Sequence, residues 1–383
     1  MNKISKVAIH NVFKPNETAI INIDSPVTIL TGYNGVGKST TLGVIHSTVS
    51  LYGDCEYSFP RSNWGSQIFL ENGVVLNHVK MARPVDKEFS LPTLKRTSDK
   101  VDALKIFYDE LLARAVPDSK QKKLLVSKEG EKRDTRSTNI LSVELGSKNK
   151  NRNKKNDGGD VQGPGIQSVL YCDELFNFNA AVDESENLDE LDIFSKKNTL
   201  DKTLYFLLLE FSSLDVKTAT APHVASILRN VIDLFADREM PEALRRQIFE
   251  YEKMQRAGAH GEFLNEANLF FEMTNREVFV GDNGFLSLRL KSDLSEVKWF
   301  NLSKGEKTLL CLLLAVFLNK DKNTLFLLDE PDLSLHIKWQ KQLLKSLFSL
   351  APNSQFLVST HSPAMVGNVP GEKVINIGFF SKA

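Results

Sequence analysis

Gly32-Tyr-Asn-Gly-Val-Gly-Lys-Ser39 is the stretch of the sequence that says most about the fold. It follows an apolar run at residues 27–30, which predicts a buried strand, and precedes residues 40–51, which predict a helix. In that context the glycines indicate a loop that wraps phosphate groups with its backbone N–H groups. Lys38 would reach the β- and γ-phosphates, and Ser39 would ligate Mg²⁺. A chance glycine-rich turn is the competing interpretation, and the flanking strand and helix count against it.

A second apolar run, residues 324–328, ends in Asp329 and Glu330. An uninterrupted apolar run of this length predicts a strand that is buried on both faces, as in a parallel sheet. Because open α/β sheets bind ligands at the C-terminal ends of their strands, both carboxylates are expected beside the phosphate-binding loop. Asp329 would complete the Mg²⁺ shell, and Glu330 would orient an attacking water. Solvated acidic residues at a strand end are the alternative.

Two further segments fit the same kind of site. Asn301-Leu-Ser-Lys-Gly-Glu306 precedes residues 307–318, which predict a helix, so Ser303 and the Gly305 amide lie where a helix start can hold an anion. An ordinary capping box between Ser303 and Glu306 is the alternative, and both interpretations can hold together. Gln355-Phe-Leu-Val-Ser-Thr-His361 predicts another buried strand, at whose end His361 could contact a γ-phosphate.

The order of these four segments resembles the nucleotide-binding domain of ABC-type ATPases. Within that superfamily the chain is similar to the SMC-like and RecF-like branch. It most closely resembles the compact ATPases of bacterial anti-phage systems, such as PtuA of Septu and of retrons, AriA of PARIS, and the ATPase half of the OLD proteins. The stretch Glu330-Pro-Asp-Leu-Ser-Leu-His336, with Trp339 and Gln340, carries this closer resemblance. The resemblance covers about residues 1–80 and 280–375.

The resemblance implies a role for each matching position. ATP and Mg²⁺ are the implied cofactors, with Ser39 and Asp329 holding the metal. Glu330 would be the catalytic base and His361 would sense the γ-phosphate. Lys38, which would bind the triphosphate, is the third expected catalytic residue. The residues expected to bind the nucleotide are Gly32, Asn34, Gly35, Gly37, Lys38, Ser39, Thr40, Ser303 and Gly305.

In this superfamily the segment at 301–306, called the signature here, acts across a dimer of heads. The resemblance therefore implies a homodimer or a higher homo-oligomer in which Ser303 and Gly305 touch the ATP of the other protomer. The signature has Lys304 where glycine is commoner. The glutamine that usually links the metal to the helical lobe is left open between Gln167 and Gln67.

The expected fold class is α/β, an ABC-type P-loop NTPase head with a central β-sheet and an inserted, mainly helical lobe. Residues 1–96 would form the first half of the head and residues 276–383 the second, with hairpin turns at Asn72-Gly73 and at 281–284. Residues 97–275 would form the lobe, with helices predicted over 99–115, 199–214, 222–235 and 241–254. The lobe sequence has no sustained heptads, so a long coiled-coil arm is not expected.

Composition and charge add four expectations. The 383 residues are 42% hydrophobic, which supplies a substantial core. The longest apolar run is too short to cross a bilayer, and the first residues lack the apolar region of a signal peptide, so a cytoplasmic protein without a membrane partner is expected. Cys55, Cys172 and Cys311 are widely spaced and are predicted to be reduced core cysteines. Lys120 to Lys155 holds twelve Lys and Arg against four Asp and Glu, so residues 118–165 are predicted to form a flexible basic loop. Such a loop is either a solvated linker or a nonspecific contact for nucleic acid.

Three functional hypotheses follow. The leading one is an ATPase of an anti-phage complex that regulates a separate effector, a nuclease or another toxin. The second is a RecF-like ATPase of DNA repair or recombination that acts directly on DNA. The third, a transporter ATPase, ranks last because Lys38 and Ser303 lie 265 residues apart.

Overall fold

The computed structural model describes residues 3–13, 17–52, 59–61, 63–82, 137–144, 165–172, 175–178, 199–218, 260–281 and 285–377. The chain forms two compact units. The first comprises Met1–Glu186, Lys322–Leu333 and Asn353–Ala383, and the second comprises Asn187–Asp321 and Ser334–Pro352. Within the described ranges no helix combines the length and the apolarity that a membrane span requires.

The first unit contains a six-stranded sheet with the strand order β14-β3-β13-β12-β7-β8. Its strands are β3 (Val27–Thr31), β7 (Gln167–Cys172), β8 (Leu175–Phe178), β12 (Thr324–Asp329), β13 (Gln355–Ser359) and β14 (Lys373–Asn376). All pairs are parallel except β7 with β8. Every residue of β12 and β13 is buried, as their apolar runs predict for strands covered on both faces.

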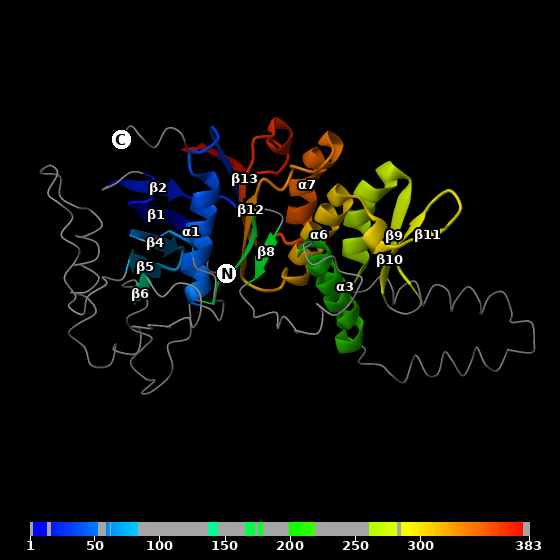
Figure 1. The fold of residues 1–383 in the computed structure, drawn as a ribbon, viewed down its shortest axis with the longest axis horizontal. Helices are drawn as coiled ribbons and strands as arrows, with labels where there is room; N and C mark the ends of the chain where they lie inside the picture. Colours follow the sequence, from blue (N-terminus) through cyan, green and yellow to red (C-terminus); the bar gives the residue numbers. More distant parts are fainter. Residues whose placement is uncertain are drawn as a thin grey trace, which may run out of the picture. The chain divides into compact units, whose positions relative to one another are not determined.

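A second, antiparallel sheet in this unit has the strand order β2-β1-β4-β5-β6. Its strands are β1 (Ile4–His10), β2 (Thr18–Asn22), β4 (Trp64–Leu70), β5 (Val75–Ala82) and β6 (Ser137–Glu144). Helix α1 (Lys38–Leu51) lies between the two sheets (Figure 1). Leu42 and Val49 of α1 share one hydrophobic core with residues of both sheets, including Ile68 and Leu327. The helix that follows the phosphate-binding loop is therefore anchored on two sides.

The second unit is mainly helical. It contains α3 (Thr199–Thr218), a helical segment at 260–271, α6 (Lys304–Leu318) and α7 (Ile337–Leu350). A small antiparallel sheet, β11-β10-β9, is formed by β9 (Arg276–Val280), β10 (Leu286–Leu290) and β11 (Glu296–Val297). The rings of Phe211, Phe263 and Phe317 join α3, the 260–271 segment and α6, with centroid distances of 5.0 to 5.8 Å. Short 3₁₀ turns, η5 (Glu272–Thr274), η6 (Trp299–Asn301) and, in the first unit, η7 (Pro363–Met365), complete the described elements.

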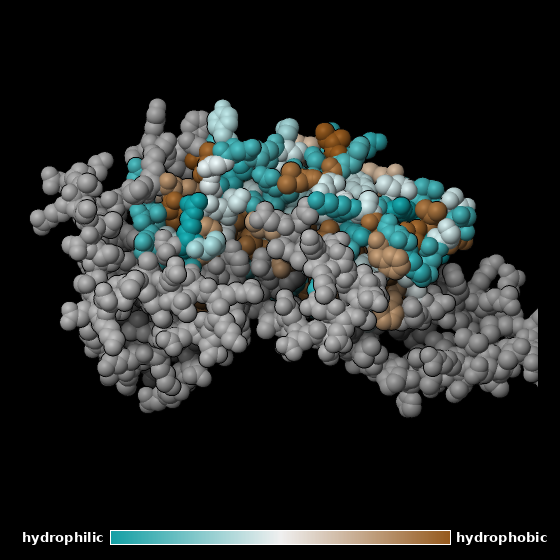
Figure 2. Space-filling model, in the orientation of Figure 1, coloured by the Kyte–Doolittle hydropathy of each residue, from teal (hydrophilic) through white to brown (hydrophobic). Residues whose placement is uncertain are grey.

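The described surface carries both hydrophilic and hydrophobic residues. Figure 2 shows hydrophilic and hydrophobic residues intermingled over the described part of one face. Scattered exposed apolar side chains are normal for a folded protein and need no special explanation.

The structure confirms the predicted fold class and most of the predicted elements. The strands and helices expected around the four motifs are present, and so are both hairpins, β4-β5 and β9-β10. The helix predicted at 199–214 is α3. The helices predicted at 99–115, 222–235 and 241–254 lie outside the described residues, as does Cys55. Cys311 is buried and Cys172 is partly exposed.

The division into units differs from the predicted ranges 1–96, 97–275 and 276–383. Strands β6, β7 and β8 fall within the range expected for the helical lobe, yet they belong to the sheets of the first unit. Strand β6 also falls within the predicted flexible basic loop, where it pairs with β5 along its whole length. Short strands inside a long, helix-rich sequence are easily missed, because only pairing with distant strands stabilises them.

Candidate nucleotide-binding site

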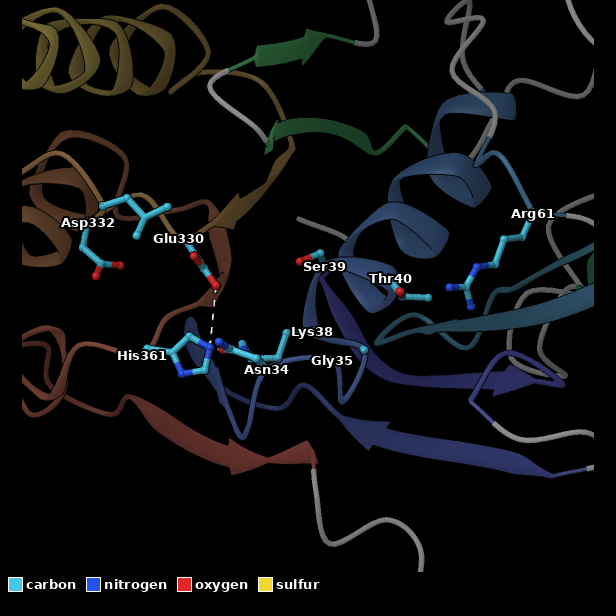
Figure 3. A pocket seen from close by; sticks show the side chains of 11 residues that line it. Asn34, Gly35, Lys38, Ser39, Thr40, Arg61, Glu330, Asp332 and His361 are labelled. Carbon is cyan, nitrogen blue, oxygen red and sulfur yellow. Dashed lines mark hydrogen bonds and ion pairs between the residues drawn. The ribbon is translucent and has the colours of Figure 1, made fainter.

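A pocket of about 570 Å³ lies where β3, β12 and β13 end (Figure 3). Its volume is typical of pockets that hold small ligands. The phosphate-binding loop, the segment after β12 and the segment after β13 meet here because parallel strands deliver their C-terminal ends to one edge of the sheet. The lining residues are Asn34, Gly35, Gly37, Lys38, Ser39, Thr40, Arg61, Glu330, Asp332, Leu333 and His361. Eight of the predicted site residues are thereby brought together.

The phosphate-binding loop has the backbone that its glycines predict. Gly37 caps α1 with a φ of 100°, in the left-handed region that glycine adopts at little cost. A Cβ atom at Gly37 would overlap the ring of Phe13, so a side chain is excluded there on two grounds. The first amide groups of an α-helix have no partner within the helix, and in α1 they belong to residues that line the pocket, which suits an anion.

Lys38 connects the loop to the histidine after β13. Its ammonium group donates to the carbonyl oxygens of Gly32, at 3.2 Å, and Tyr33, at 3.4 Å. Gly32 therefore takes part through its carbonyl group, although it does not line the pocket. The same ammonium lies 2.6 Å from Nε2 of His361. A phosphate group in the pocket would compete with these partners for Lys38.

His361 lies between the ammonium group of Lys38 and the carboxylate of Glu330. Nε2 of His361 lies 3.6 Å from Oε1 of Glu330, and Figure 3 shows the side chains of Lys38, His361 and Glu330 converging. One imidazole nitrogen either accepts or donates a hydrogen bond, so Nε2 can serve Lys38 or Glu330, but not both at once. His361 therefore lies within reach of both Lys38 and Glu330, next to the phosphate-binding loop.

Glu330 is aimed into the pocket by an unusual backbone. Its φ is 47°, a left-handed conformation that costs a non-glycine residue about 1 to 2 kcal/mol. The Glu330 amide donates to the carbonyl oxygen of Ser359 at 2.9 Å, and the Glu330 carbonyl accepts from the Leu333 amide at 3.2 Å. Strained residues held in place by their surroundings are concentrated at functional sites, which supports a chemical role for this side chain.

Asp329 ends β12 and is buried, and it is not among the residues that line the pocket. One of its carboxylate oxygens accepts from the hydroxyl of Ser359, and the other accepts from the thiol of Cys172 at 3.3 Å. Each oxygen keeps a second lone pair, so these bonds are compatible with a metal or a metal-bound water. The Asp329 carboxylate and the Ser39 hydroxyl are hard oxygen donors, the kind of ligand that Mg²⁺ prefers.

The signature lies in the second unit, at the start of α6. Ser303 caps the helix, and the predicted capping box is confirmed. The Ser303 amide and hydroxyl donate to Oε2 of Glu306 at 2.9 and 2.8 Å, and the Ser303 hydroxyl accepts from the Glu306 amide at 3.4 Å. Gly305 is packed so closely that a Cβ atom would overlap the carbonyl oxygen of Ser334. Ser303 and Gly305 do not line the pocket, and their predicted contact with a nucleotide remains a prediction.

Neither glutamine candidate lies in the pocket. Gln167 begins β7, where its side chain donates to the hydroxyl of Thr324 at 2.7 Å. β7 and β12 are parallel, and both start at the end of the sheet opposite the phosphate-binding loop. Gln167 is therefore a wrong assignment for the residue that links to the metal. Gln67 lies in β4 of the antiparallel sheet and donates to Asn77 at 3.0 Å. At the end of β7, beside Asp329, stands Cys172 instead.

Three lining residues were not predicted, namely Arg61, Asp332 and Leu333. Asp332 and Leu333 belong to the stretch after Glu330, and the tight turn there brings them back to the pocket. Asp332 accepts from the hydroxyl of Thr360 at 2.7 Å, so it also ties this turn to the segment that carries His361. Arg61 comes from the segment between α1 and β4, where no motif in the sequence signals its position.

The chain matches one family model and is similar to curated proteins that are named as probable ATPases. Residues 161–367, more than half of the chain, match the family model described as "AAA domain, putative AbiEii toxin, Type IV TA system". The "Retron Vc95 probable ATPase" of Vibrio cholerae is 37% identical over 113 residues, 26% of this chain and 22% of the relative. The "Retron Ec83 probable ATPase" of Escherichia coli is 34% identical over 84 residues, 19% of this chain and 16% of the relative. The chain thus covers about a fifth of the length of these curated relatives.

Among solved structures, the SMC head domain from Thermotoga maritima has a TM-score of 0.41 at 15% identity, covering 98% of this chain and 96% of that chain. The Smc head domain from Pyrococcus furiosus, bound to the C-terminal domain of ScpA, has a TM-score of 0.42 at 14% identity, covering 98% and 94%.

The family match and the retron relatives confirm the resemblance stated from the sequence. Together with the phosphate-binding loop in the pocket, they point to a P-loop protein with an AAA domain that is similar to probable ATPases of retrons. The chain belongs to the family of AAA domains described as putative AbiEii toxins of type IV toxin–antitoxin systems.

Proposed function

We propose that this protein binds and hydrolyses ATP with the help of Mg²⁺, dimerises head to head on ATP, and thereby regulates a separate effector, a nuclease or another toxin, in anti-phage defence. The observation that carries the ATPase part is the convergence of Lys38, Ser39, Glu330 and His361 in one pocket. These residues come from three chain segments that lie far apart in sequence. Their common location supports a single reaction centre.

Each residue has a task that its geometry supports. Lys38 and the N–H groups at the start of α1 would hold the phosphates. Glu330 would accept a hydrogen bond from the attacking water and orient it, because the backbone of Glu330 directs its carboxylate into the pocket. His361, which can leave Lys38, would hold the terminal phosphate. Ser39 and Asp329 would hold Mg²⁺, which lends charge stabilisation to phosphoryl transfer when it is bound.

Dimerisation is proposed because the signature, in the second unit, is built like an anion-binding helix start, and the resemblance implies that such a segment acts across a dimer of heads. Ser303 and Lys304 are exposed, and α6 offers its first amide groups there. A second copy of the chain would bring a bound triphosphate to this surface. Both partners would then complete each other's site.

Regulation of an effector and a role in defence rest on the names of the two relatives, which belong to retrons. The chain covers only a small part of each relative, and the effector is proposed by its chemistry alone, as a nuclease or another toxin. A cytoplasmic location follows from the same proposal. The runner-up, a RecF-like ATPase that acts on DNA, predicts ATP-dependent DNA binding by the purified protein instead.

The decisive test uses the Glu330→Gln variant, which should keep ATP bound. Light scattering after size exclusion should show a dimer with ATP and a smaller species without it. Adding Ser303→Arg should abolish the dimer and preserve ATP binding, because the longer cation would occupy the place of the phosphate. A dimer that forms equally well in the double variant would refute the contact across protomers.

A pull-down from the native host tests the effector. Co-purification of a nuclease or another toxic protein with the tagged chain, changed by ATP, supports the proposal. Tight, ATP-dependent binding of DNA by the pure protein without such a partner would favour the RecF-like alternative.

A further inference from the structure

The start of α6 carries two buried side chains of opposite charge on consecutive residues. Glu306 pairs with Arg276 of β9, with side-chain exposures of 6% and 24%. Lys307 pairs with Asp201 of α3 at 2.7 Å, with exposures of 10% and 17%. Both pairs lie within the second unit. Two ion pairs that each include one buried side chain lie on one helical turn, and burying a charge is costly unless it is well compensated.

Only one of the two pairs reaches the signature serine. Oε2 of Glu306 accepts both from the Ser303 amide, at 2.9 Å, and from the Ser303 hydroxyl, at 2.8 Å, while Oε1 accepts from Arg276. A serine hydroxyl has a single proton. That proton points to Glu306 in the structure, so Ser303 can donate to an incoming phosphate only if its hydroxyl turns away from the carboxylate.

We propose that Arg276 is a positioning residue for Ser303, which neutralises Glu306 so that the serine hydroxyl can turn to a phosphate oxygen of the partner's nucleotide. The inference rests on the proposed ATP-driven dimer and deepens it. Arg276 satisfies one carboxylate oxygen and shares its negative charge, which weakens the hold of Glu306 on the serine proton.

Without Arg276, Glu306 would hold the proton of the Ser303 hydroxyl more firmly. The buried Glu306 carboxylate would keep the amide and the hydroxyl of Ser303 as donors, and it would bind them more strongly. It would also present an uncompensated negative charge beside an arriving triphosphate, which opposes association. Loss of Arg276 should therefore weaken the dimer through Ser303, beyond any effect on the stability of the unit.

The test measures the protomer concentration at which half of the protein is dimeric, by sedimentation in saturating ATP with Glu330→Gln in every variant. Arg276→Met should raise this concentration about tenfold or more, the effect of one lost charge-assisted hydrogen bond. Arg276→Lys keeps the charge and should lose less. The affinity of single protomers for ATP should not change, because Arg276 does not line the pocket.

Two further variants separate positioning from simple destabilisation. Glu306→Gln removes the charge that Arg276 neutralises, so adding it to Arg276→Met should restore much of the dimer. The matched control is Lys307→Met combined with Asp201→Asn, which removes the neighbouring buried pair without touching Ser303. It should lower the melting temperature and leave the dimerisation concentration close to that of the parent.

The outcomes distinguish the two proposals. A Glu330→Gln parent that stays monomeric with ATP refutes the proposed dimer and this inference with it. A parent that dimerises while Arg276→Met dimerises equally well refutes the inference alone. It is also refuted if Glu306→Gln brings no recovery, or if the control pair weakens the dimer as much as Arg276→Met does.

Discussion

Replacing Glu330 by Gln should stop ATP hydrolysis and leave the fold and ATP binding intact. Gln has nearly the shape of Glu, and the main-chain hydrogen bonds that hold residue 330 at a φ of 47° do not involve the side chain. The contact that is lost is the one to His361, 3.6 Å away, between side chains that are 31% and 41% exposed. A pair with that much exposure contributes at most about 1 kcal/mol, so the melting temperature should change little.

The effect on hydrolysis should be much larger. A positioned general base accelerates a reaction by roughly 10² to 10⁴. That range corresponds to about 3 to 5 kcal/mol of transition-state stabilisation. ATP affinity should stay the same or improve, because the change removes a negative charge that faces the phosphates.

The assay is phosphate release at saturating ATP with Mg²⁺, together with equilibrium binding of a fluorescent ATP analogue. Asp332→Asn is the matched control, since Asp332 is the other carboxylate that lines the pocket. It should retain far more activity than Glu330→Gln. Hydrolysis that survives in Glu330→Gln and disappears in Asp332→Asn would refute the assignment of the base.

Four other outcomes are expected. Lys38→Met should reduce ATP affinity by at least about tenfold to a hundredfold, since a charge-assisted hydrogen bond to phosphate is worth about 1.5 to 3 kcal/mol, and unchanged affinity in a binding titration would contradict the phosphate role. Gly305→Ala should lower the free energy of unfolding by about 1 to 3 kcal/mol, because the new methyl group meets the backbone carbonyl of Ser334, and a denaturant titration measures this. Burial lowers the pKa of His46 from 6.5 to about 3, so the unfolded chain takes up a proton that the folded one does not, and stability should fall as the pH drops from 6.5 towards 3. His46→Gln should flatten that decline in melting experiments. For the basic loop, nucleic-acid binding at low salt should weaken, and its salt dependence should flatten by up to about four units, when five cations are replaced by Ser. These are Lys148, Lys150, Arg152, Lys154 and Lys155. A salt dependence equal to that of the parent would make the loop a solvated linker.

Local sequence was sufficient to predict the parts of the site that are written in consecutive residues. The phosphate-binding loop, the strand that ends in Asp329 and Glu330, and the capping box of Ser303 each depend on a few neighbouring residues with a defined backbone. Turn residues, capping residues and apolar runs act at short range, so they can be recognised without knowing the fold. The parallel sheet then follows, because fully apolar strands must be covered on both faces.

Other features could not be predicted because they depend on which distant segments meet. The contact between Lys38 and His361 joins residues 323 positions apart, and the link between Arg276 and Glu306 crosses 30. Gln167 looked suitable by residue type, but the pairing of β7 with β12 places it at the wrong end of the sheet. Only the three-dimensional pairing of the strands decided this, since parallel register is a property of two segments and not of one.

What the sequence alone determined about this protein is therefore its chemistry, a P-loop site with an acidic strand end and a helix start fit for an anion. The tertiary structure decided the arrangement, including the left-handed turn at Glu330, the place of Arg61 and Asp332 in the pocket, and the division into two units. The physical reason is the distance along the chain over which the stabilising interactions act. Motifs are stabilised by interactions between neighbours in the chain, whereas the pocket and the units arise from packing between segments that the chain brings together only when it folds.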